Sequence, residues 1–182
     1  MADQKKAFVF QIKAMKSLLT LFLIIFSMTN TNAQKFGTSI ALSTNKVFGL
    51  DFFYGKENNR FHFGYSHQFN GQKNTVVRER KANYGLTKIE DGDFFWLIDL
   101  GYSRVINQKL TINPEISFGS KNEFTNYKDD RFSDNGYSLI SKSKAKTGIG
   151  LNLGYLVHKH LEPFIGYHTL KKVNFGLRFI LL

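Results

Sequence analysis

The chain has 182 residues, a formal net charge of +11 at pH 7 and no Cys. This length suits one domain, and the lack of Cys excludes a disulfide scaffold, a Cys-ligated zinc site and thiol catalysis. With two Pro, 42% hydrophobic and 15% aromatic residues, the composition also excludes a disordered or low-complexity chain.

The first segment has the order of a secretory signal. An uninterrupted apolar run, LLTLFLIIF, occupies residues 18–26 and is shorter than the ~20 apolar residues that a transmembrane helix needs. Lys13 and Lys16 precede the run, and small residues follow it up to Ala33. We therefore predict a cleaved signal peptide over residues 1–33, with Met15 as an alternative start, and one exported domain over residues 34–182.

The exported domain alternates between apolar and polar or small residues with a period of two. In residues 94–103, for example, the even positions carry large apolar side chains, whereas Asp99, Gly101 and Ser103 occupy odd ones. Such alternation predicts β-strands with one apolar face. Nine segments are candidate strands: 36–44, 46–54, 60–69, 75–86, 93–104, 109–119, 145–157, 161–169 and 172–182.

An antiparallel bacterial barrel of one chain has an even number of strands. We expect residues 36–54 to be one kinked element, with the polar segment 75–86 the next candidate for a loop. Eight strands are then the favoured number, with ten as the alternative. The expected tight links lie at residues 70–73, 106–108 and 158–160, and the expected long polar links at 55–59, 87–93 and 120–144.

Three features favour lipid as the surroundings of the apolar face. The strands are about ten residues long, near the ~9–11 that cross a bilayer obliquely. Tyr54, Tyr102 and Tyr155 mark strand ends, as interfacial aromatic girdles do. The opposite face mixes Gly with charged and amide residues, which suits a narrow lumen. We predict an all-β fold, an antiparallel up-and-down transmembrane β-barrel; a secreted soluble barrel with an apolar ligand in its core is the alternative.

The last strand carries the most specific motif. Residues 174–181, NFGLRFIL, place a polar residue, a Gly, an aromatic and a hydrophobic residue at Asn174, Gly176, Phe179 and Leu181. In this pattern the chain resembles small outer-membrane β-barrels of the OmpX and opacity-protein kind, in the short versions common in Bacteroidota. The resemblance implies location in the outer membrane and insertion by the barrel-assembly machinery, with those four residues as the assembly signal. It implies no specific task.

Four charged residues share the inward parity of their strands: Asp99, Glu115, Glu162 and Arg178. We predict that they form a charge network in the lumen, because paired charges are tolerated in a narrow interior. An eight-stranded barrel is just wide enough for its own side chains, so plugging is favoured over conduction. A narrow porin-like channel for small solutes stays an alternative.

The five His are the candidates for a catalytic or metal site. His62 and Ser66 share a strand face but lie ~13 Å apart along one strand, and His158 with His160 gives only two imidazoles. We expect no catalytic, cofactor-binding or metal site. A lipid A-modifying barrel enzyme remains the least favoured alternative, since nucleophile and base must lie in contact.

Basic residues surround the longest predicted link: Lys121, Lys128, Arg131, Lys142, Lys144 and Lys146. Such groups can pair with lipopolysaccharide phosphates, and a merely solvated loop is an equal alternative. Scattered basic residues, export and the lack of a binding motif argue against nucleic acid. We therefore predict a monomeric outer-membrane protein with a structural or surface-interaction role through its extracellular loops, with outer-membrane lipid and lipopolysaccharide as partners.

Overall fold

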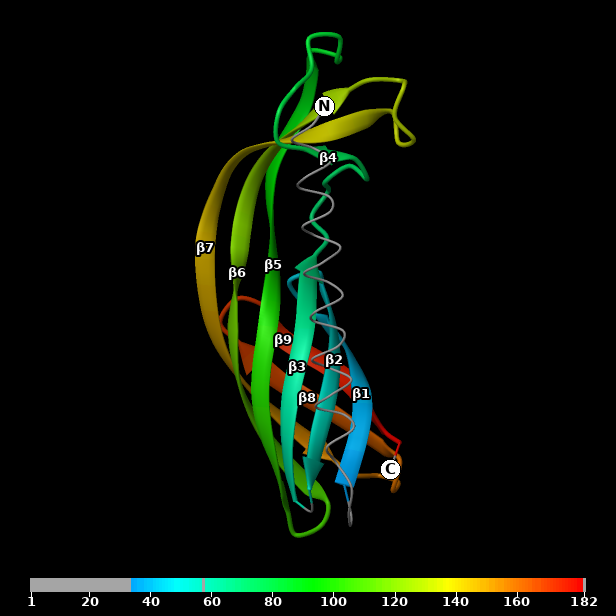
Figure 1. Ribbon diagram of the computed structural model, residues 1–182, viewed down its shortest axis with the longest axis vertical. Coiled ribbons are helices and arrows are strands. Elements are labelled where there is room, and N and C mark those ends of the chain that lie inside the picture. The colour runs from blue at the N-terminus through cyan, green and yellow to red at the C-terminus, as the bar shows by residue number, and fades with distance from the viewer. Residues whose placement is uncertain (1–33, 57, 182) are drawn as a thin grey trace, which may run out of the picture. The chain divides into compact units, whose positions relative to one another are not determined.

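The structure, a computed structural model, describes residues 34–56 and 58–181, so the predicted signal peptide lies outside the described residues. Within these ranges the chain is all strand, turn and loop, and no helix is long and apolar enough to cross a membrane. The strands are β1 (Gln34–Ser43), β2 (Val47–Lys56), β3 (Asn59–Gln68), β4 (Val76–Val77), β5 (Thr87–Ile106), β6 (Leu110–Lys128), β7 (Gly136–Tyr155), β8 (Leu161–His168) and β9 (Lys172–Ile180) (Figure 1).

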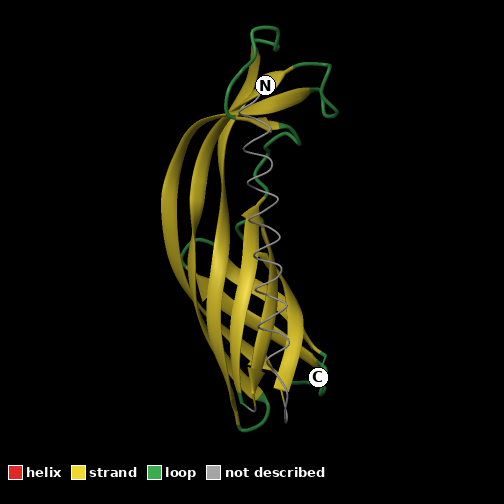
Figure 2. Cartoon of the chain, viewed as in Figure 1, coloured by secondary structure: helices red, strands yellow, loops and turns green. Residues whose placement is uncertain are grey.

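Eight of the strands in the described part of the chain close into a barrel (Figure 2). The neighbours run in the order β1, β2, β3, β5, β6, β7, β8, β9, and β9 pairs with β1 to complete the ring. Every pair around the ring is antiparallel, whereas the two-residue β4 pairs parallel with β7 outside it. The predicted all-β up-and-down barrel with eight strands is therefore confirmed.

The prediction that residues 36–54 form one kinked element is wrong. β1 and β2 are separate strands, paired from Gln34 with Lys56 to Leu42 with Phe48. Their turn places Lys46 at φ 55°, a left-handed conformation that reverses the chain without a Gly. The segment that leaves the barrel is 75–86, of which only Val76–Val77 pairs with another strand.

The expected connection lengths also need correction. Residues 55–56 end β2 and Asn59 begins β3, so no long link lies there, whereas residues 70–73 belong to a long connection over residues 69–86. Residues 87–93 and most of 120–144 are strand, because β5, β6 and β7 continue for 20, 19 and 20 residues. Their pairing extends to Thr87 with Lys128 and Lys128 with Gly136.

The two ends of the barrel therefore differ. At the turn end lie both described termini and the short connections that join β2 to β3, β5 to β6 and β7 to β8. At the loop end, β7 leaves β8 beyond Gly150 and β5 leaves β3 beyond Trp96. Residues 87–95, 120–128 and 136–147 thus continue beyond the ring as a three-stranded extension, called the wall below, which β4 joins at Ser138 and Leu139. Figure 1 shows the wall rising above the shorter strands.

The barrel is apolar outside and polar inside. Large hydrophobic side chains are exposed on every barrel strand, including Phe52, Phe63, Leu151 and Phe175. Buried positions along the same strands carry Ser, Thr, Asn, Asp, Glu and Arg. A soluble barrel has the reverse arrangement, so a calyx with an apolar core does not fit this chain. The apolar belt stops near Phe118 and Ile149, where the wall begins.

Inward glycines make room for the polar side chains of neighbouring strands. A Cβ at Gly154 would lie 2.5 Å from Glu162 Oε1 and 2.9 Å from Arg178 Nη1. A Cβ at Gly148 would lie 2.5 Å from the His168 ring. The Gly content of the inward face thus reflects the bulk of charged and imidazole groups packed in a narrow bore.

Candidate functional site: the polar interior and the loop-end vestibule

The inward residues of β5 show how the interior is layered from the loop end to the turn end. Phe95 and Leu97 come first, followed by Asp99, then Gly101 and Ser103. Side chains from other strands join each level, because antiparallel register places them opposite these residues. The interior therefore consists of an apolar layer above two charged layers.

The apolar layer closes the barrel below its loop-end mouth. Val47, Phe95 and Leu97 form a buried cluster, and Leu170 from the β8–β9 turn packs against it. Leu97 is fully buried. We call these four residues the apolar seal. Tightly packed hydrocarbon in a bore of this width leaves little space for water or ions to pass.

The first charged layer lies beneath the apolar seal. Lys171 belongs to the β8–β9 turn, yet its side chain reaches into the bore, where Nζ lies 2.8 Å from Asp99 Oδ2 and 2.6 Å from Glu115 Oε1. Ser66 and Ser117 both donate hydrogen bonds to Asp99. Lys171, Asp99 and Glu115 form the loop-end cluster. Burial of these charges is tolerable because each one is paired.

The second charged layer lies nearer the turn end. Glu162 accepts from Arg60 Nη1 at 2.7 Å through Oε2 and from Arg178 Nη1 through Oε1. All three side chains are at most 1% exposed. Glu162 and Arg178 are directly opposed on β8 and β9, and the Arg178 guanidinium lies 4.4 Å from the centre of the Phe164 ring. Arg60, Glu162 and Arg178 form the turn-end cluster.

The structure places all four predicted lumen residues in the interior, but in two clusters. Glu162 joins Arg178, whereas Asp99 and Glu115 join Lys171. The sequence reasoning missed Arg60 and Lys171. Arg60 shares the inward parity of its strand and could have been found, whereas Lys171 lies in a turn where parity gives no direction.

Two His–Ser contacts also escaped sequence reasoning, because each joins different strands. His62 Nε2 lies 2.8 Å from Ser103 Oγ, and His168 Nε2 lies 3.0 Å from Ser117 Oγ. His168 Nδ1 accepts the backbone N–H groups of Leu170 and Lys171, so the ring proton is on Nε2. His168 thus donates to Ser117, which donates to Asp99. This direction is opposite to that of a serine hydrolase, where the His accepts the Ser proton.

Neither pair is placed to meet a lipid. His62, Ser103, Ser117 and His168 are all buried inside the barrel. Among the described residues no group of three or more His, Asp or Glu is arranged to hold a metal ion. His158 and His160 have ring centres 5.6 Å apart, and His160 Nδ1 contacts the Ile180 carbonyl oxygen.

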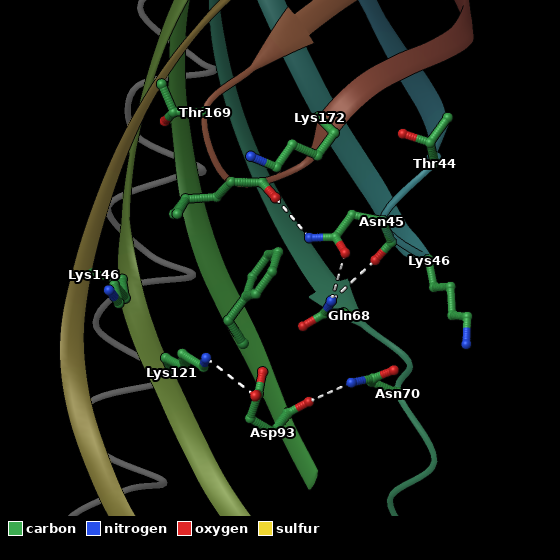
Figure 3. A pocket seen from close by; sticks show the side chains of 12 residues that line it. Thr44, Asn45, Lys46, Gln68, Asn70, Asp93, Lys121, Lys146, Thr169 and Lys172 are labelled. Carbon is green, nitrogen blue, oxygen red and sulfur yellow. Dashed lines mark hydrogen bonds and ion pairs between the residues drawn. The ribbon is translucent and has the colours of Figure 1, made fainter.

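Above the apolar seal, the loop end holds a cavity of about 380 Å³, called the vestibule below. Its sides come from the β1–β2 turn, the end of β3, the wall and the β8–β9 turn. Figure 3 shows Lys121, Lys146 and Lys172 around the space, with Asn45 and Gln68 between the turns. Phe95 and Leu170 of the apolar seal also line it, so the vestibule ends blindly at the seal.

The six predicted lipopolysaccharide contacts fall into two groups. The first group lies on the face of the wall that continues the inward side of the barrel and consists of Lys121, Lys142, Lys144 and Lys146. The register shows this, because Lys146 lies opposite the inward Gly119, Lys144 opposite Lys121, and Lys142 opposite Glu123. Lys128 and Arg131 lie at the far tip of the wall. None of the first four lies on the outward side of its strand.

At the tip, Arg131 is engaged within the chain. Its guanidinium donates to Asp129, Nε at 2.9 Å and Nη2 at 2.6 Å, and lies 5.7 Å from the Tyr84 ring. These hydrogen bonds, with one from the Gly85 N–H, hold the pKa of the Asp129 carboxyl well below its usual value. Tyr127, Phe132 and Tyr137 complete an aromatic cluster around this pair. The tip is therefore a structured cap.

The four predicted assembly residues all lie on β9. Asn174 and Gly176 face inward: Asn174 donates to Asn152, and Gly176 faces the Phe164 ring. Phe179 and Leu181 are exposed on the outer face near the turn end. The predicted signal thus presents its two apolar residues to the outside of the barrel.

No protein-family model matches the sequence, and no curated protein does. Solved structures give similarity in fold. Ail, the attachment invasion locus protein of Yersinia pestis, in complex with the heparin analogue sucrose octasulfate, is 15% identical, with a TM-score of 0.42 and coverage of 81% of this chain and 93% of Ail.

Two further solved structures are similar to this chain at comparably low sequence identity. Neisserial surface protein A is 11% identical, with a TM-score of 0.42 and coverage of 80% of this chain and 94% of that protein. A de novo designed transmembrane β-barrel is 14% identical, with a TM-score of 0.41 and coverage of 84% and 98%. At these identities the similarity concerns the barrel fold alone.

Proposed function

We propose that this chain is a monomeric integral outer-membrane β-barrel that does not conduct solutes and serves surface interaction through its wall. The observation that carries the proposal is the apolar belt around a closed barrel with a charged interior. Exposing Phe52, Phe63, Leu151 and Phe175 to water would be costly, whereas hydrocarbon accommodates them. Strands of eight to ten residues, as in β1, β2, β3, β8 and β9, suit a bilayer crossed obliquely.

The interior supports a scaffold rather than a pore. A solute entering at the loop end meets the apolar seal, and below it the Lys171 side chain spans to Asp99 and Glu115. The turn-end cluster fills the next layer. Three successive layers of packed side chains close the bore, as is usual for an eight-stranded barrel.

The wall supports a role in surface interaction. It continues beyond the apolar belt, and its outward positions there include the half-buried Ser120 and the exposed Ser143, which suit water. The structured tip holds the β6–β7 loop in one arrangement, so that a partner binding there would pay little ordering entropy.

Membrane location is tested by fractionation and gel mobility. The full chain is produced in a Gram-negative host, cells are separated into soluble, inner-membrane and outer-membrane fractions, and each is run with and without boiling. We expect an outer-membrane band whose mobility shifts on boiling, because a closed barrel resists detergent until heated. A soluble protein without a shift would overturn the proposal.

Orientation is tested with introduced thiols, since the chain has no Cys. Asp130→Cys lies in the β6–β7 loop at the tip of the wall, and Lys109→Cys in the β5–β6 turn at the opposite end; both positions are exposed. A membrane-impermeant maleimide added to intact cells should label the first variant alone, and both after lysis. Labelling of Lys109→Cys alone in intact cells would reverse the orientation and refute a surface role for the wall.

A further inference from the structure

The vestibule carries more positive charge than its own carboxylates neutralise. Lys121 Nζ lies 3.1 Å from Asp93 Oδ2. In the described part of the chain, neither Lys146 nor Lys172 has a carboxylate within ion-pair distance. Figure 3 shows the Lys172 side chain extending across the space toward the wall, while Lys46 points away from it.

The basic surface continues from the vestibule up the wall. Lys142 and Lys144 alternate with Lys146 on the same face of β7, and Lys144 pairs across the strands with Lys121. Lys144 Nζ lies 3.7 Å from Glu123 Oε1. Glu123 and Asp93 are the two carboxylates that form ion pairs with lysines of this surface. The surface thus has five lysines, Lys121, Lys142, Lys144, Lys146 and Lys172, against two carboxylates, Asp93 and Glu123.

A buried acceptor without a partner lies in the same cavity. Gln68 is 5% exposed, and its Nε2 donates to the backbone and side-chain oxygens of Asn45, both at 3.1 Å. Its Oε1 has no hydrogen-bond partner, and in Figure 3 this oxygen points into the space. A buried acceptor left without a donor costs free energy, so the cavity is suited to a ligand that brings a hydroxyl or N–H group.

We propose that the vestibule binds a saccharide that carries two phosphate groups. Each phosphate monoester carries about −1.5 to −2 charges at pH 7. Two of them therefore balance the excess of three lysines over carboxylates on the vestibule and the adjoining face of the wall taken together. Ammonium groups bind phosphate as point charges, and a sugar hydroxyl would satisfy Gln68 Oε1. A cavity of about 380 Å³ falls within the usual range for small-ligand sites.

Such a ligand has two sources, a lipid-borne glycan of the membrane surface or a soluble sugar phosphate. Binding of such a ligand in the cell depends on the proposed function in one respect, which is that the loop end of the barrel must face the outside of the cell. Binding to purified full-length protein does not depend on orientation. If the thiol-labelling pattern holds and no binding occurs, only the present inference fails.

The first experiment measures binding of glucose 1,6-bisphosphate to the folded chain in detergent by isothermal titration calorimetry. The vestibule variant combines Lys146→Gln with Lys172→Gln. The matched control combines Lys109→Gln with Lys159→Gln, which removes the same charge from exposed sites in the turn-end connections. Heat-modifiable gel mobility establishes that every variant is folded.

We expect the vestibule variant to lose about tenfold or more in affinity and the control to change less than about twofold. Gln68→Leu should weaken binding of the bisphosphate without changing its salt dependence, because it removes a neutral hydrogen bond. Unphosphorylated glucose should not bind measurably. No binding of the bisphosphate at about 1 mM in physiological salt, or equal losses in the vestibule and control variants, would overturn the proposal.

The second experiment separates the two sources. Nanodiscs containing the chain are prepared with bisphosphorylated lipopolysaccharide or with its enzymatically dephosphorylated form. If lipid-borne phosphate occupies the vestibule, the first nanodiscs should not bind glucose 1,6-bisphosphate and the second should. If both bind it equally, the ligand is a soluble sugar phosphate. Failure to bind in either preparation would contradict the detergent result and refute the site.

Discussion

Removal of Glu162 should destabilise the barrel more than removal of either arginine that it binds. Glu162→Gln keeps the shape of the side chain but leaves Arg60 and Arg178 in the bore, each at most 1% exposed, without a carboxylate. Breaking a buried ion pair by removing one partner costs about 3–5 kcal/mol. Arg178→Leu leaves Glu162 paired with Arg60 at 2.7 Å, and its cost should be about 1–3 kcal/mol from the lost charged hydrogen bond.

The comparison uses urea unfolding of the chain in lipid vesicles, followed by Trp96 fluorescence and gel mobility. We expect the unfolding midpoint to fall for both variants and further for Glu162→Gln. Arg60→Gln combined with Glu162→Gln should recover part of the loss, since one unpaired guanidinium is removed. Equal stability of Arg178→Leu and the unaltered chain would show that the turn-end cluster adds no stability, and a larger loss for Arg178→Leu than for Glu162→Gln would refute the charge argument.

Three further predictions concern interior packing, conduction and the tip of the wall. Gly154→Val should destabilise the barrel by about 1–3 kcal/mol in urea unfolding, because its Cβ would press on Glu162 and Arg178; Ala145→Val, at an exposed position of the wall, should stay within about 0.5 kcal/mol. In planar bilayers the chain should give no single-channel steps, and regular conductance would show that the apolar seal is open. The pKa of Asp129 is lowered in the folded chain. Its contribution to the free energy of unfolding is therefore complete above the ordinary carboxyl pKa of about 4, and it is lost as the pH falls toward the pKa of the folded state. Near-ultraviolet circular dichroism should therefore differ between the chain and Asp129→Asn at neutral pH and converge in acid.

The barrel was predictable because alternation reports the strand faces directly. The parity of Asp99, Glu115, Glu162 and Arg178 matches their inward placement. What parity cannot report is register, since it gives the side of a strand and not the residue opposite. The division into two clusters follows from the cross-strand neighbours and from Lys171, whose turn has no alternation to read. His168 meets Ser117 for the same reason, from strands far apart in sequence.

The wall was missed because strand length was inferred from the bilayer. About ten residues cross the hydrocarbon. Residues 120–128 and 136–147 are rich in Lys, Ser and Asn, with only scattered apolar residues among them, so their composition suggests a loop. Yet a strand needs only paired backbone groups, and β5, β6 and β7 supply these to one another outside the belt. Because the inward side of such an extension no longer faces a closed bore, its charges need no internal partner. Lys142 and Lys146 can therefore remain unpaired there. Lys171 directly precedes Lys172 in the sequence, but its side chain lies inside the bore and is held by two carboxylates.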